Sequence, residues 1–352
     1  MSSKTLSEKA VGVVGAGSFG SVIANMLAVN RKVILYARDK QVVKRIREEQ
    51  QHKGFIIHPN VEPTFDMAYL AANCDVIFPI VSSSGFRNMI KKLAPHLHPY
   101  HIVIHGTKGL DLRLPEGETL QSVKKLYRHQ IKTMSEVIRE ESVAVRIGCL
   151  AGPNLARELA DQQPAATVVA SHFNEVIQTG QKLLRSDRFQ VYGNNELEGV
   201  ELAGVLKNII AIAAGALSGL GYGENARGLL ISRGIVEIIH IGKAFGLTAK
   251  AFLGIAGIGD LVATCSSTTS RNFTVGYRLA KGETLQEILQ DMEEVAEGVN
   301  TVQIVKKFTD TYKVRALITE TVYKVLFEKL TVKEALQYLM RYPLNIDINF
   351  ID

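Results

Sequence analysis

One long apolar segment of the chain contains a single charged residue, Lys207. From Leu202 through Gly223 no other charged side chain occurs. If the segment is a helix, small or apolar residues surround Lys207 and its ammonium loses hydration. This loss lowers the pKa of an ammonium from its usual value of about 10.4 toward the range useful for proton transfer. Lys207 is therefore a candidate general acid and base, although a lysine that extends past an apolar stripe to solvent has the same pattern.

Two later segments carry polar side chains suited to act with such a lysine. Asp260 follows Gly257-Ile-Gly259, and Thr264 comes four residues later, so a helix would place the carboxylate and the hydroxyl on one face. Asp260 is a candidate partner for Lys207 or for a substrate hydroxyl. The run Ser270-Arg271-Asn272 combines a hydroxyl, a guanidinium and an amide, which suit a bound phosphate. A surface turn or a helix cap uses the same residue types.

A glycine motif near the N-terminus indicates a dinucleotide site. Gly15-x-Gly17-x-x-Gly20 follows the apolar run Ala10–Val14 and precedes a helix-compatible stretch. Gly15 permits a tight turn, Gly17 lets backbone approach a pyrophosphate, and Gly20 allows close packing of a helix on a strand. Amides at the start of that helix would point at the phosphates. Strand, motif and helix together predict dinucleotide binding.

Two basic residues stand at the ends of predicted strands. Arg38 and Asp39 follow the end of the second predicted strand, where a carboxylate suits the ribose of NAD and an arginine suits the 2′-phosphate of NADP. Because Arg38 comes first, the sequence favours NADP(H) and leaves NAD(H) open, with a surface ion pair as the alternative. Lys108 follows the run His101–His105, at a strand end where α/β sheets bind ligands. The histidines at positions 96, 98, 101 and 105 have no carboxylate near them at the spacing of metal ligands, so no metal site is predicted.

The elements that would position these residues fall into two groups. Up to about residue 193, β-rich runs alternate with helical stretches, as in a Rossmann-like, doubly wound α/β domain with a mainly parallel sheet. After that point helical signals dominate, with a core helix from Leu197 to Leu220. We therefore expect a dinucleotide-binding domain over residues 1–195 and an all-helical substrate-binding and catalytic domain over residues 196–352. The predicted strands are Ala10–Val14, Lys32–Tyr36, Asp75–Val81, His101–His105, Val143–Leu150, Ala165–Ala170 and Arg188–Tyr192.

Three further helical signals come from spacing. Between Asp111 and Arg146, apolar residues recur from Leu120 to Ile138 at steps of three or four, which predicts an amphipathic helix. Thr284-x-x-Glu287 and Thr331-x-x-Glu334 have the pattern of capping boxes at helix starts.

Composition limits the remaining function classes. The 352 residues carry a formal charge of +6 spread along the chain, which favours small anionic ligands over nucleic acid. The hydrophobic fraction of 46% is ordinary for a globular protein. Three widely separated cysteines, odd in number and without Cys-x-x-Cys, indicate neither a disulfide framework nor a zinc site. Residues 1–9 lack the apolar stretch of an export signal, so we expect a cytoplasmic protein without membrane insertion.

The chain resembles the NAD(P)-dependent glycerol-3-phosphate dehydrogenases in segments that occur in family order from residue 12 to about residue 300. The matching segments are Gly15-Ala-Gly-Ser-Phe-Gly20, Thr107-Lys-Gly-Leu110, Gly152-Pro153, Leu206-Lys-Asn-Ile-Ile-Ala-Ile-Ala-Ala-Gly215, Gly257-Ile-Gly-Asp-Leu261, Ser270-Arg-Asn272 and Ala296-Glu-Gly298. The glycine motif is shared by many dehydrogenases, whereas the Lys-Asn, Gly-Asp-Leu and Ser-Arg-Asn segments together are specific. The resemblance implies reversible reduction of dihydroxyacetone phosphate by NAD(P)H to sn-glycerol 3-phosphate for phospholipid synthesis, by a homodimer.

The resemblance also implies residue roles. Lys207 matches the family's proton donor and acceptor, with Asp260 and Lys108 as further catalytic positions. The substrate-side positions are Lys108, Gly152, Asn154, Lys207, Asn208, Asp260, Thr264, Ser270, Arg271 and Asn272. The cofactor positions are Gly15, Gly17, Ser18, Phe19, Gly20, Arg38, Lys108, Ala156, Arg271, Val295 and Glu297. The chain departs from the common bacterial pattern at Phe19, where Trp is usual, at Asn154, where Ser or Thr is usual, and in an insertion from Leu114 to Lys132.

Two other functions are compatible with a two-domain chain of this kind. One is a ketopantoate-type or 3-hydroxyacid reductase, whose substrate carries a carboxylate in place of a phosphate. The other is a protein that senses NADP(H) without catalysis. The Ser270-Arg271-Asn272 segment argues against the first, and Lys207 together with Asp260 argues against the second.

Overall fold

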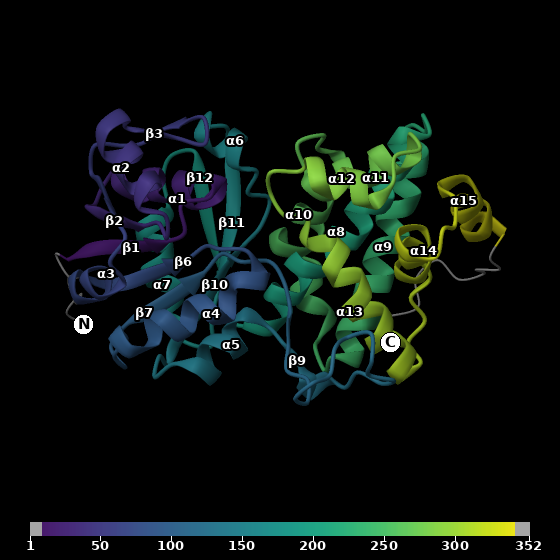
Figure 1. Ribbon diagram of the computed structural model, residues 1–352, viewed down its shortest axis with the longest axis horizontal. Coiled ribbons are helices and arrows are strands. Elements are labelled where there is room, and N and C mark those ends of the chain that lie inside the picture. The colour runs from purple at the N-terminus through teal and green to yellow at the C-terminus, as the bar shows by residue number, and fades with distance from the viewer. Residues whose placement is uncertain (1–8, 342–352) are drawn as a thin grey trace. The chain divides into compact units, whose positions relative to one another are not determined.

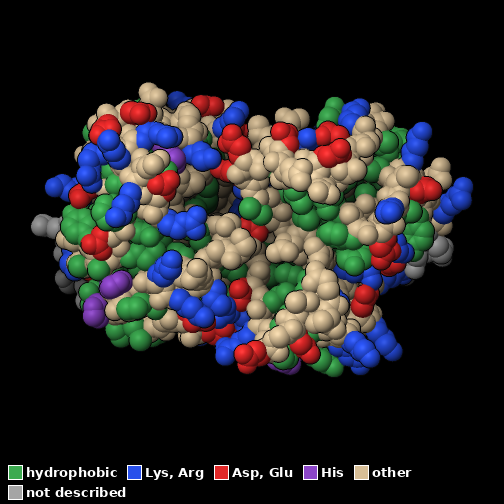
Figure 2. Space-filling model, in the orientation of Figure 1, with side chains coloured by type: hydrophobic (Ala, Val, Ile, Leu, Met, Phe, Trp, Pro, Cys, Tyr) green, Lys and Arg blue, Asp and Glu red, His purple; other side chains and the backbone are tan. Residues whose placement is uncertain are grey.

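The computed structural model describes residues 9–341 and divides into two compact units (Figure 1). Within the described residues, the first unit comprises 9–111 and 133–197, and the second comprises 112–132 and 198–341. Residues 112–132, which we expected within the dinucleotide-binding part of the chain, thus cluster with the second unit. The expectation that no export signal is present concerns residues 1–9, of which 1–8 lie outside the described part. On the face shown in Figure 2, acidic and basic side chains are interspersed.

An eight-stranded sheet forms the centre of the first unit, in the order β12-β11-β10-β7-β6-β1-β2-β5. Every neighbouring pair is parallel except β10 and β11, which run antiparallel. The strands are β1 (Ala10–Val14), β2 (Val33–Tyr36), β5 (Val61–Thr64), β6 (Cys74–Pro79), β7 (Ile102–His105), β10 (Arg146–Ala151), β11 (Ala165–Ala170) and β12 (Phe189–Asn194). The Rossmann-like, mainly parallel sheet predicted from the sequence is therefore confirmed, and each of the seven predicted strands is present within a few residues of its expected ends.

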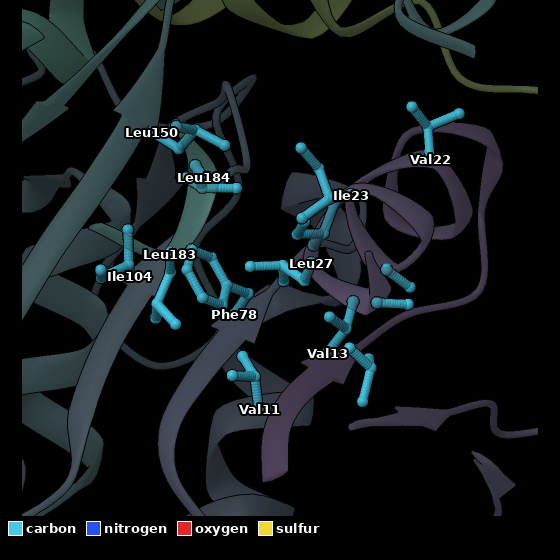
Figure 3. Packing of buried hydrophobic residues seen from close by; sticks show 14 of the residues in the cluster. Val11, Val13, Val22, Ile23, Leu27, Phe78, Ile104, Leu150, Leu183 and Leu184 are labelled. Carbon is cyan, nitrogen blue, oxygen red and sulfur yellow. The ribbon is translucent and has the colours of Figure 1, made fainter. Parts of the chain in front are cut away.

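Helices cover both faces of this sheet. The helices of the unit are α1 (Ser18–Ala28), α2 (Lys40–Glu49), α3 (Met67–Asn73), α4 (Ser83–Leu93), η1 (Ala94–His96), α5 (Met134–Glu141), α6 (Ala156–Ala160) and α7 (Asn174–Leu184). One apolar core joins the sheet to α1 and α7, through residues such as Ile23, Leu27, Phe78 and Leu183 (Figure 3). A second core joins the opposite face to α3, α4 and α5. This two-sided burial explains why the central strands read as continuous apolar runs.

Some short elements of the first unit escaped sequence analysis. Strand β5 contains Pro63, which cannot donate to a sheet ladder, and it is tolerated because β5 lies at the sheet edge. A hairpin of two short strands, β3 (Gln51–His52) and β4 (Phe55–Ile56), follows α2. Its turn residues Lys53 and Gly54 both have positive φ, at 52° and 78°, as a tight two-residue hairpin requires.

The second unit is built almost entirely of helices in its described part. Its helices are η2 (Arg128–Gln130), α8 (Leu197–Gly219), α9 (Glu224–Ala244), η3 (Ala249–Phe252), η4 (Ile255–Gly259), α10 (Asp260–Ser266), α11 (Arg271–Ala280), α12 (Leu285–Asp291), α13 (Glu297–Tyr312), α14 (Leu317–Phe327) and α15 (Val332–Arg341). Helix α8 is the one described helix long and apolar enough to cross a membrane, and 83% of its most apolar window is buried in the protein. The predicted core helix is therefore confirmed. Both predicted capping boxes are also present, at the starts of α12 and α15.

The predicted amphipathic helix from Leu120 to Ile138 is wrong over most of its length. Helix α5 begins only at Met134, and residues 113–127 form no regular helix. Val123 and Leu126 are buried, but they pack as part of an irregular segment whose backbone is bound by helix α13. Lys307 donates to the carbonyls of Leu120 and Val123, and the hydroxyl of Thr311 accepts from the amide of Leu126 at 2.9 Å. These tertiary bonds replace the intrahelical bonds that the apolar spacing had suggested.

Helices α8 and α11 approach each other unusually closely, through two glycines. A Cβ added to Gly276 of α11 would lie 1.8 Å from the carbonyl oxygen of Ile212 in α8. A Cβ added to Gly215 of α8 would lie 1.9 Å from the carbonyl oxygen of Phe273. Because these contacts are to backbone, they cannot be relieved by a side-chain rotation. The close approach fixes α8, which carries Lys207, against the Ser270-Arg271-Asn272 segment that begins α11.

A matched pair of glycine substitutions tests this contact. We expect Gly276→Ala to lower the free energy of unfolding by about 2 kcal/mol or more, because the helices must separate. Gly228, in the exposed part of α9, has nothing within 4 Å of an added Cβ. Gly228→Ala should therefore raise stability by about 0.5 to 1 kcal/mol, the usual gain for that change inside a helix. Urea denaturation followed by circular dichroism measures both; equal effects of the two substitutions would contradict the close approach.

Candidate active site

Three polar side chains form a buried cluster within the second unit. The Nζ of Lys207 on α8 donates to Oδ1 of Asp260 at 2.7 Å and to the hydroxyl of Thr264. The Thr264 hydroxyl lies 3.2 Å from the same Asp260 oxygen, to which it can donate. The exposed fractions are 5% for Lys207, 2% for Asp260 and 4% for Thr264. The predicted pairing of Lys207 with Asp260 is present, and Lys207 does not extend to solvent.

The local fold explains why Asp260 and Thr264 face the lysine together. They stand four residues apart on α10, the spacing that puts two side chains on one helix face. The preceding turn, η4, packs so closely that a Cβ on Gly257 would lie 1.9 Å from the carbonyl oxygen of Phe252. Glycine at 257 therefore allows the chain to enter α10 at the position that aims Asp260 at Lys207.

A buried thiol adjoins this cluster. Cys265, next to Thr264 in sequence, is fully buried, and burial raises the pKa of its thiol to about 12. The neighbouring carboxylate of Asp260 raises that pKa further, whereas the ammonium of Lys207 lowers it. The thiol therefore stays protonated at neutral pH and is a passive part of the apolar wall. In such a setting the attraction between Lys207 and Asp260 is weakened little by solvent.

The Ser270-Arg271-Asn272 segment forms the first turn of α11, and its three side chains have different contacts. The Ser270 hydroxyl caps the helix, accepting from the amide of Phe273. The amide oxygen of Asn272 accepts from the amide of Gly298 at 2.9 Å, and this bond ties α11 to the start of α13. Two of the three predicted phosphate-binding residues therefore also stabilise the fold.

Arg271 is the exposed member of that segment. Its side chain is 49% exposed and lies 3.3 Å from a carboxylate oxygen of Glu294, with Nη1 donating to the carbonyl of Val295 at 3.0 Å. An ion pair at such exposure contributes little free energy, so a better anion can displace Glu294. Val295 is exposed and Glu297 begins α13, so the predicted cofactor positions of this unit cluster near Arg271. Asn208, beside Lys207 on α8, is buried.

In the first unit, the glycine motif forms the turn between β1 and α1. Gly15 has φ of +120°, and a Cβ there would lie 2.1 Å from the carbonyl oxygen of Ile80. A Cβ on Gly20 would lie 1.9 Å from the carbonyl oxygen of Gly15. Gly17, by contrast, has nothing within 4 Å of such an atom, and it begins α1 without a side-chain cap. Gly15 and Gly20 thus shape the turn, while the space beside Gly17 and the uncapped helix amides fit an approaching phosphate.

The other predicted cofactor positions near this turn lie on α1 and just after β2. Ser18 and Phe19 occupy the first turn of α1, and the ring of Phe19 packs toward Gly106 at the end of β7. Arg38 follows β2 and is exposed. The neighbouring Asp39 caps α2, with Oδ1 accepting from the amide of Gln41 at 2.7 Å. The carboxylate that an NAD-selective enzyme would use therefore already holds a helix terminus.

Lys108, Gly152 and Asn154 lie together at the strand ends of the first unit. The Nζ of Lys108 donates to the carbonyl of Gly152 at 2.9 Å. Asn154 donates to the hydroxyl of Thr167 at 2.9 Å, and its own amide oxygen is buried with no hydrogen-bond partner within the described residues. Ala156 begins the short helix α6 just beyond. A buried acceptor without a donor suits a ligand that carries a hydroxyl or an amide.

One contact to the glycine motif could not be predicted from the sequence. His52 of the β3–β4 hairpin is bonded to the carbonyl of Ala16, between Gly15 and Gly17. The turn pair Lys53-Gly54 is a usable signal for the hairpin, but no sequence pattern reveals a bond from a side chain to a distant carbonyl.

Two family models match the chain. A model described as the NAD-dependent glycerol-3-phosphate dehydrogenase N-terminus matches residues 10–177, and one described as the C-terminus of the same enzyme matches residues 196–337. A relative in Pseudomonas aeruginosa (strain LESB58), named glycerol-3-phosphate dehydrogenase (NAD(P)+), is 37% identical over 351 residues, which is 98% of each chain.

Solved structures of dehydrogenases are also similar to this chain. A glycerol-3-phosphate dehydrogenase from Coxiella burnetii superimposes with a TM-score of 0.84 and 29% identity, covering 95% of this chain and 99% of that one. A ketopantoate reductase family member from Ralstonia eutropha superimposes with a TM-score of 0.55 and 15% identity, over 93% and 99% of the two chains. The second similarity extends to the fold alone.

Proposed function

Since the chain belongs to the NAD-dependent glycerol-3-phosphate dehydrogenase family, a family of NAD(P)-dependent oxidoreductases, we propose that it interconverts dihydroxyacetone phosphate and sn-glycerol 3-phosphate. The single observation that carries the chemical part of this proposal is the buried cluster of Lys207, Asp260 and Thr264. An ammonium held in an apolar interior by one carboxylate and one hydroxyl is suited to donate a proton and to accept it back.

Each unit supplies residues suited to one part of the proposed reaction. In the first unit, the turn from Gly15 to Gly20 and the start of α1 would hold the dinucleotide through backbone amides. When bound, the nicotinamide supplies the hydride that reduces a carbonyl carbon. In the second unit, Lys207 would protonate the oxygen of that carbonyl and stabilise its developing negative charge, while Asp260 keeps the lysine charged and Thr264 fixes the direction of its N–H bonds.

The phosphate of the substrate would act as a handle. Arg271, with its half-exposed guanidinium, supports a phosphate site because the ion pair with Glu294 is easily exchanged. Ser270 and Asn272 would form the rim of that site, and Lys108, Gly152 and Asn154 are further substrate-side candidates in the first unit. Binding energy from the non-reacting phosphate can position the carbonyl for reaction.

We propose further that the enzyme is a cytoplasmic homodimer that supplies glycerol 3-phosphate for phospholipid synthesis. The three cysteines are buried and unpaired with one another, which supports a reducing compartment. The dimer rests on the family resemblance, and light scattering after size-exclusion chromatography would measure it.

Replacement of Lys207 tests the proton donor. We expect Lys207→Met to lower kcat for dihydroxyacetone phosphate reduction on the order of a thousandfold or more, because both proton transfer and charge stabilisation are lost. NADPH and NADH absorbance at saturating substrate gives the rate, and Lys333→Met, an exposed change on α15, is the control that should stay at the wild-type rate. Full activity of Lys207→Met would remove the lysine from the mechanism.

The same assay on the wild-type protein tests the alternative functions. Turnover of a 2-keto acid instead of dihydroxyacetone phosphate would favour the ketopantoate-type reductase, and cofactor binding without any turnover would favour a sensor of NADP(H).

Replacement of Arg38 tests cofactor preference. We propose that NADP(H) is favoured over NAD(H), because Arg38 is exposed after β2 and Asp39 is committed to the cap of α2. Arg38→Gln should lower kcat/KM for NADPH by about tenfold or more, the loss of one hydrogen bond to a charged group, and leave the value for NADH within about twofold. Lys44→Gln, an exposed change on α2, serves as the matched control. Equal losses with both cofactors would assign Arg38 to the fold and not to the 2′-phosphate.

A further inference from the structure

The hairpin that follows α2 is fixed to α1. The side-chain amide of Asn25 on α1 donates to the carbonyl of Ile56 at 2.7 Å and accepts from the amide of His58 at 2.9 Å. Phe55, opposite His52 in the hairpin, packs against the apolar core that joins α1 to the sheet. The position of His52 relative to the start of α1 is therefore determined by the fold and does not depend on the conformation of a free loop.

His52 holds the glycine motif through one hydrogen bond. Its Nε2 lies 2.7 Å from the carbonyl oxygen of Ala16, and the residue is 8% exposed. Because a carbonyl only accepts, Nε2 must carry the proton. Burial lowers the pKa of the imidazole, and the nearby charges of Lys53 and Arg45 lower it further, against the opposing effect of the Ala16 bond. The ring is therefore neutral near pH 7, with Nδ1 as an unprotonated acceptor.

This bond sets the orientation of one peptide plane. Peptide units are planar and trans, so the N–H of Gly17 points opposite to the carbonyl of Ala16. With that carbonyl directed at His52, the Gly17 N–H points away from the hairpin. Gly17 is the N-cap residue of α1, and the space that a side chain would fill there is open. The direction fixed by His52 is thus the direction of a backbone donor at the place where a phosphate would approach.

We propose that His52 is a positioning residue that orients the Ala16–Gly17 peptide and thereby raises the affinity for the dinucleotide phosphates. The proposal rests on the proposed binding of a nicotinamide dinucleotide at the glycine motif. A role in packing alone would be served better by an apolar side chain, because Nδ1 of His52 is buried with no hydrogen-bond partner in the described part of the chain. Leaving a polar atom in that state costs free energy, which the bond from Nε2 offsets.

Two amide substitutions separate positioning from packing. The side-chain nitrogen of Gln reaches the position of Nε2, whereas that of Asn reaches only the position of Nδ1, although both are polar amides of related shape. We expect His52→Gln to keep the NADPH dissociation constant within about threefold of wild type, and His52→Asn to raise it by about tenfold, the loss of one oriented hydrogen bond. Nicotinamide fluorescence titration measures both. At saturating NADPH, kcat should be unchanged in the two variants, so that the effect appears in KM for NADPH alone.

The control variant is Asn60→Ala. Asn60 also donates a side-chain bond to the backbone of α1, at the carbonyl of Ala28 and 3.0 Å, but at the far end of the helix from the glycine motif. Its NADPH affinity should equal that of wild type even if its thermal midpoint falls. Equal NADPH affinities of His52→Gln and His52→Asn would overturn the proposal. Failure of the wild-type protein to bind either NADPH or NADH would instead overturn the proposed function.

A measurement on the wild-type protein keeps the proposal testable if His52→Asn does not fold. Ring nitrogen-15 shifts of histidine-labelled protein at pH 7 should show His52 with Nε2 protonated and Nδ1 unprotonated, and addition of NADPH should shift the backbone amide of Gly17. A ring protonated at Nδ1 alone would exclude the bond to Ala16 and contradict the inference.

Discussion

The burial of one ammonium group constrains the whole second unit. Lys207 is a buried residue of the apolar helix α8. Loss of hydration is costly for its ammonium unless a carboxylate and a further acceptor replace water. Asp260 and Thr264 meet that need only because α10 begins where it does, after a turn that requires glycine at 257. The glycine contact between α8 and α11 then holds the lysine helix against the segment that contains Arg271. The residues that compensate the buried charge, Asp260 and Thr264, are therefore also the ones that would support the proposed chemistry of Lys207.

In the first unit the main constraint is the direction of the backbone N–H groups at the glycine turn. Its sheet and helices place a glycine turn between β1 and α1, and the amides there are the proposed phosphate ligands. Gly15 and Gly20 allow the turn because other side chains would collide with backbone oxygens. His52 adds a bond that fixes the plane of one peptide within it. The proposed affinity for the phosphates thus depends on the direction of backbone N–H groups, which every residue except proline has.

Sequence patterns predicted those features that depend on local spacing. The apolar strands, the core helix and the shared face of Asp260 and Thr264 follow from periodicity, and the structure contains all of them. The helix expected from Leu120 to Ile138 was wrong over most of its length because backbone groups of its first part are bound by α13, far away in sequence. For the same reason the sequence could not reveal the bond of His52 to Ala16, or the use of Asn272 as a tie to Gly298. Tertiary hydrogen bonds to backbone leave no local pattern.

The pH dependence of kcat/KM for reduction, compared between wild type and Asp260→Asn, tests most directly whether Lys207 is the proton donor held by Asp260. The donor must be protonated in this direction, so activity falls on the alkaline side as Lys207 loses its proton. Removing the carboxylate disfavours the ammonium, and the alkaline limb of the profile should move to lower pH. An alkaline limb at the same pH in both proteins would contradict the assignment of the proton donor to this buried pair.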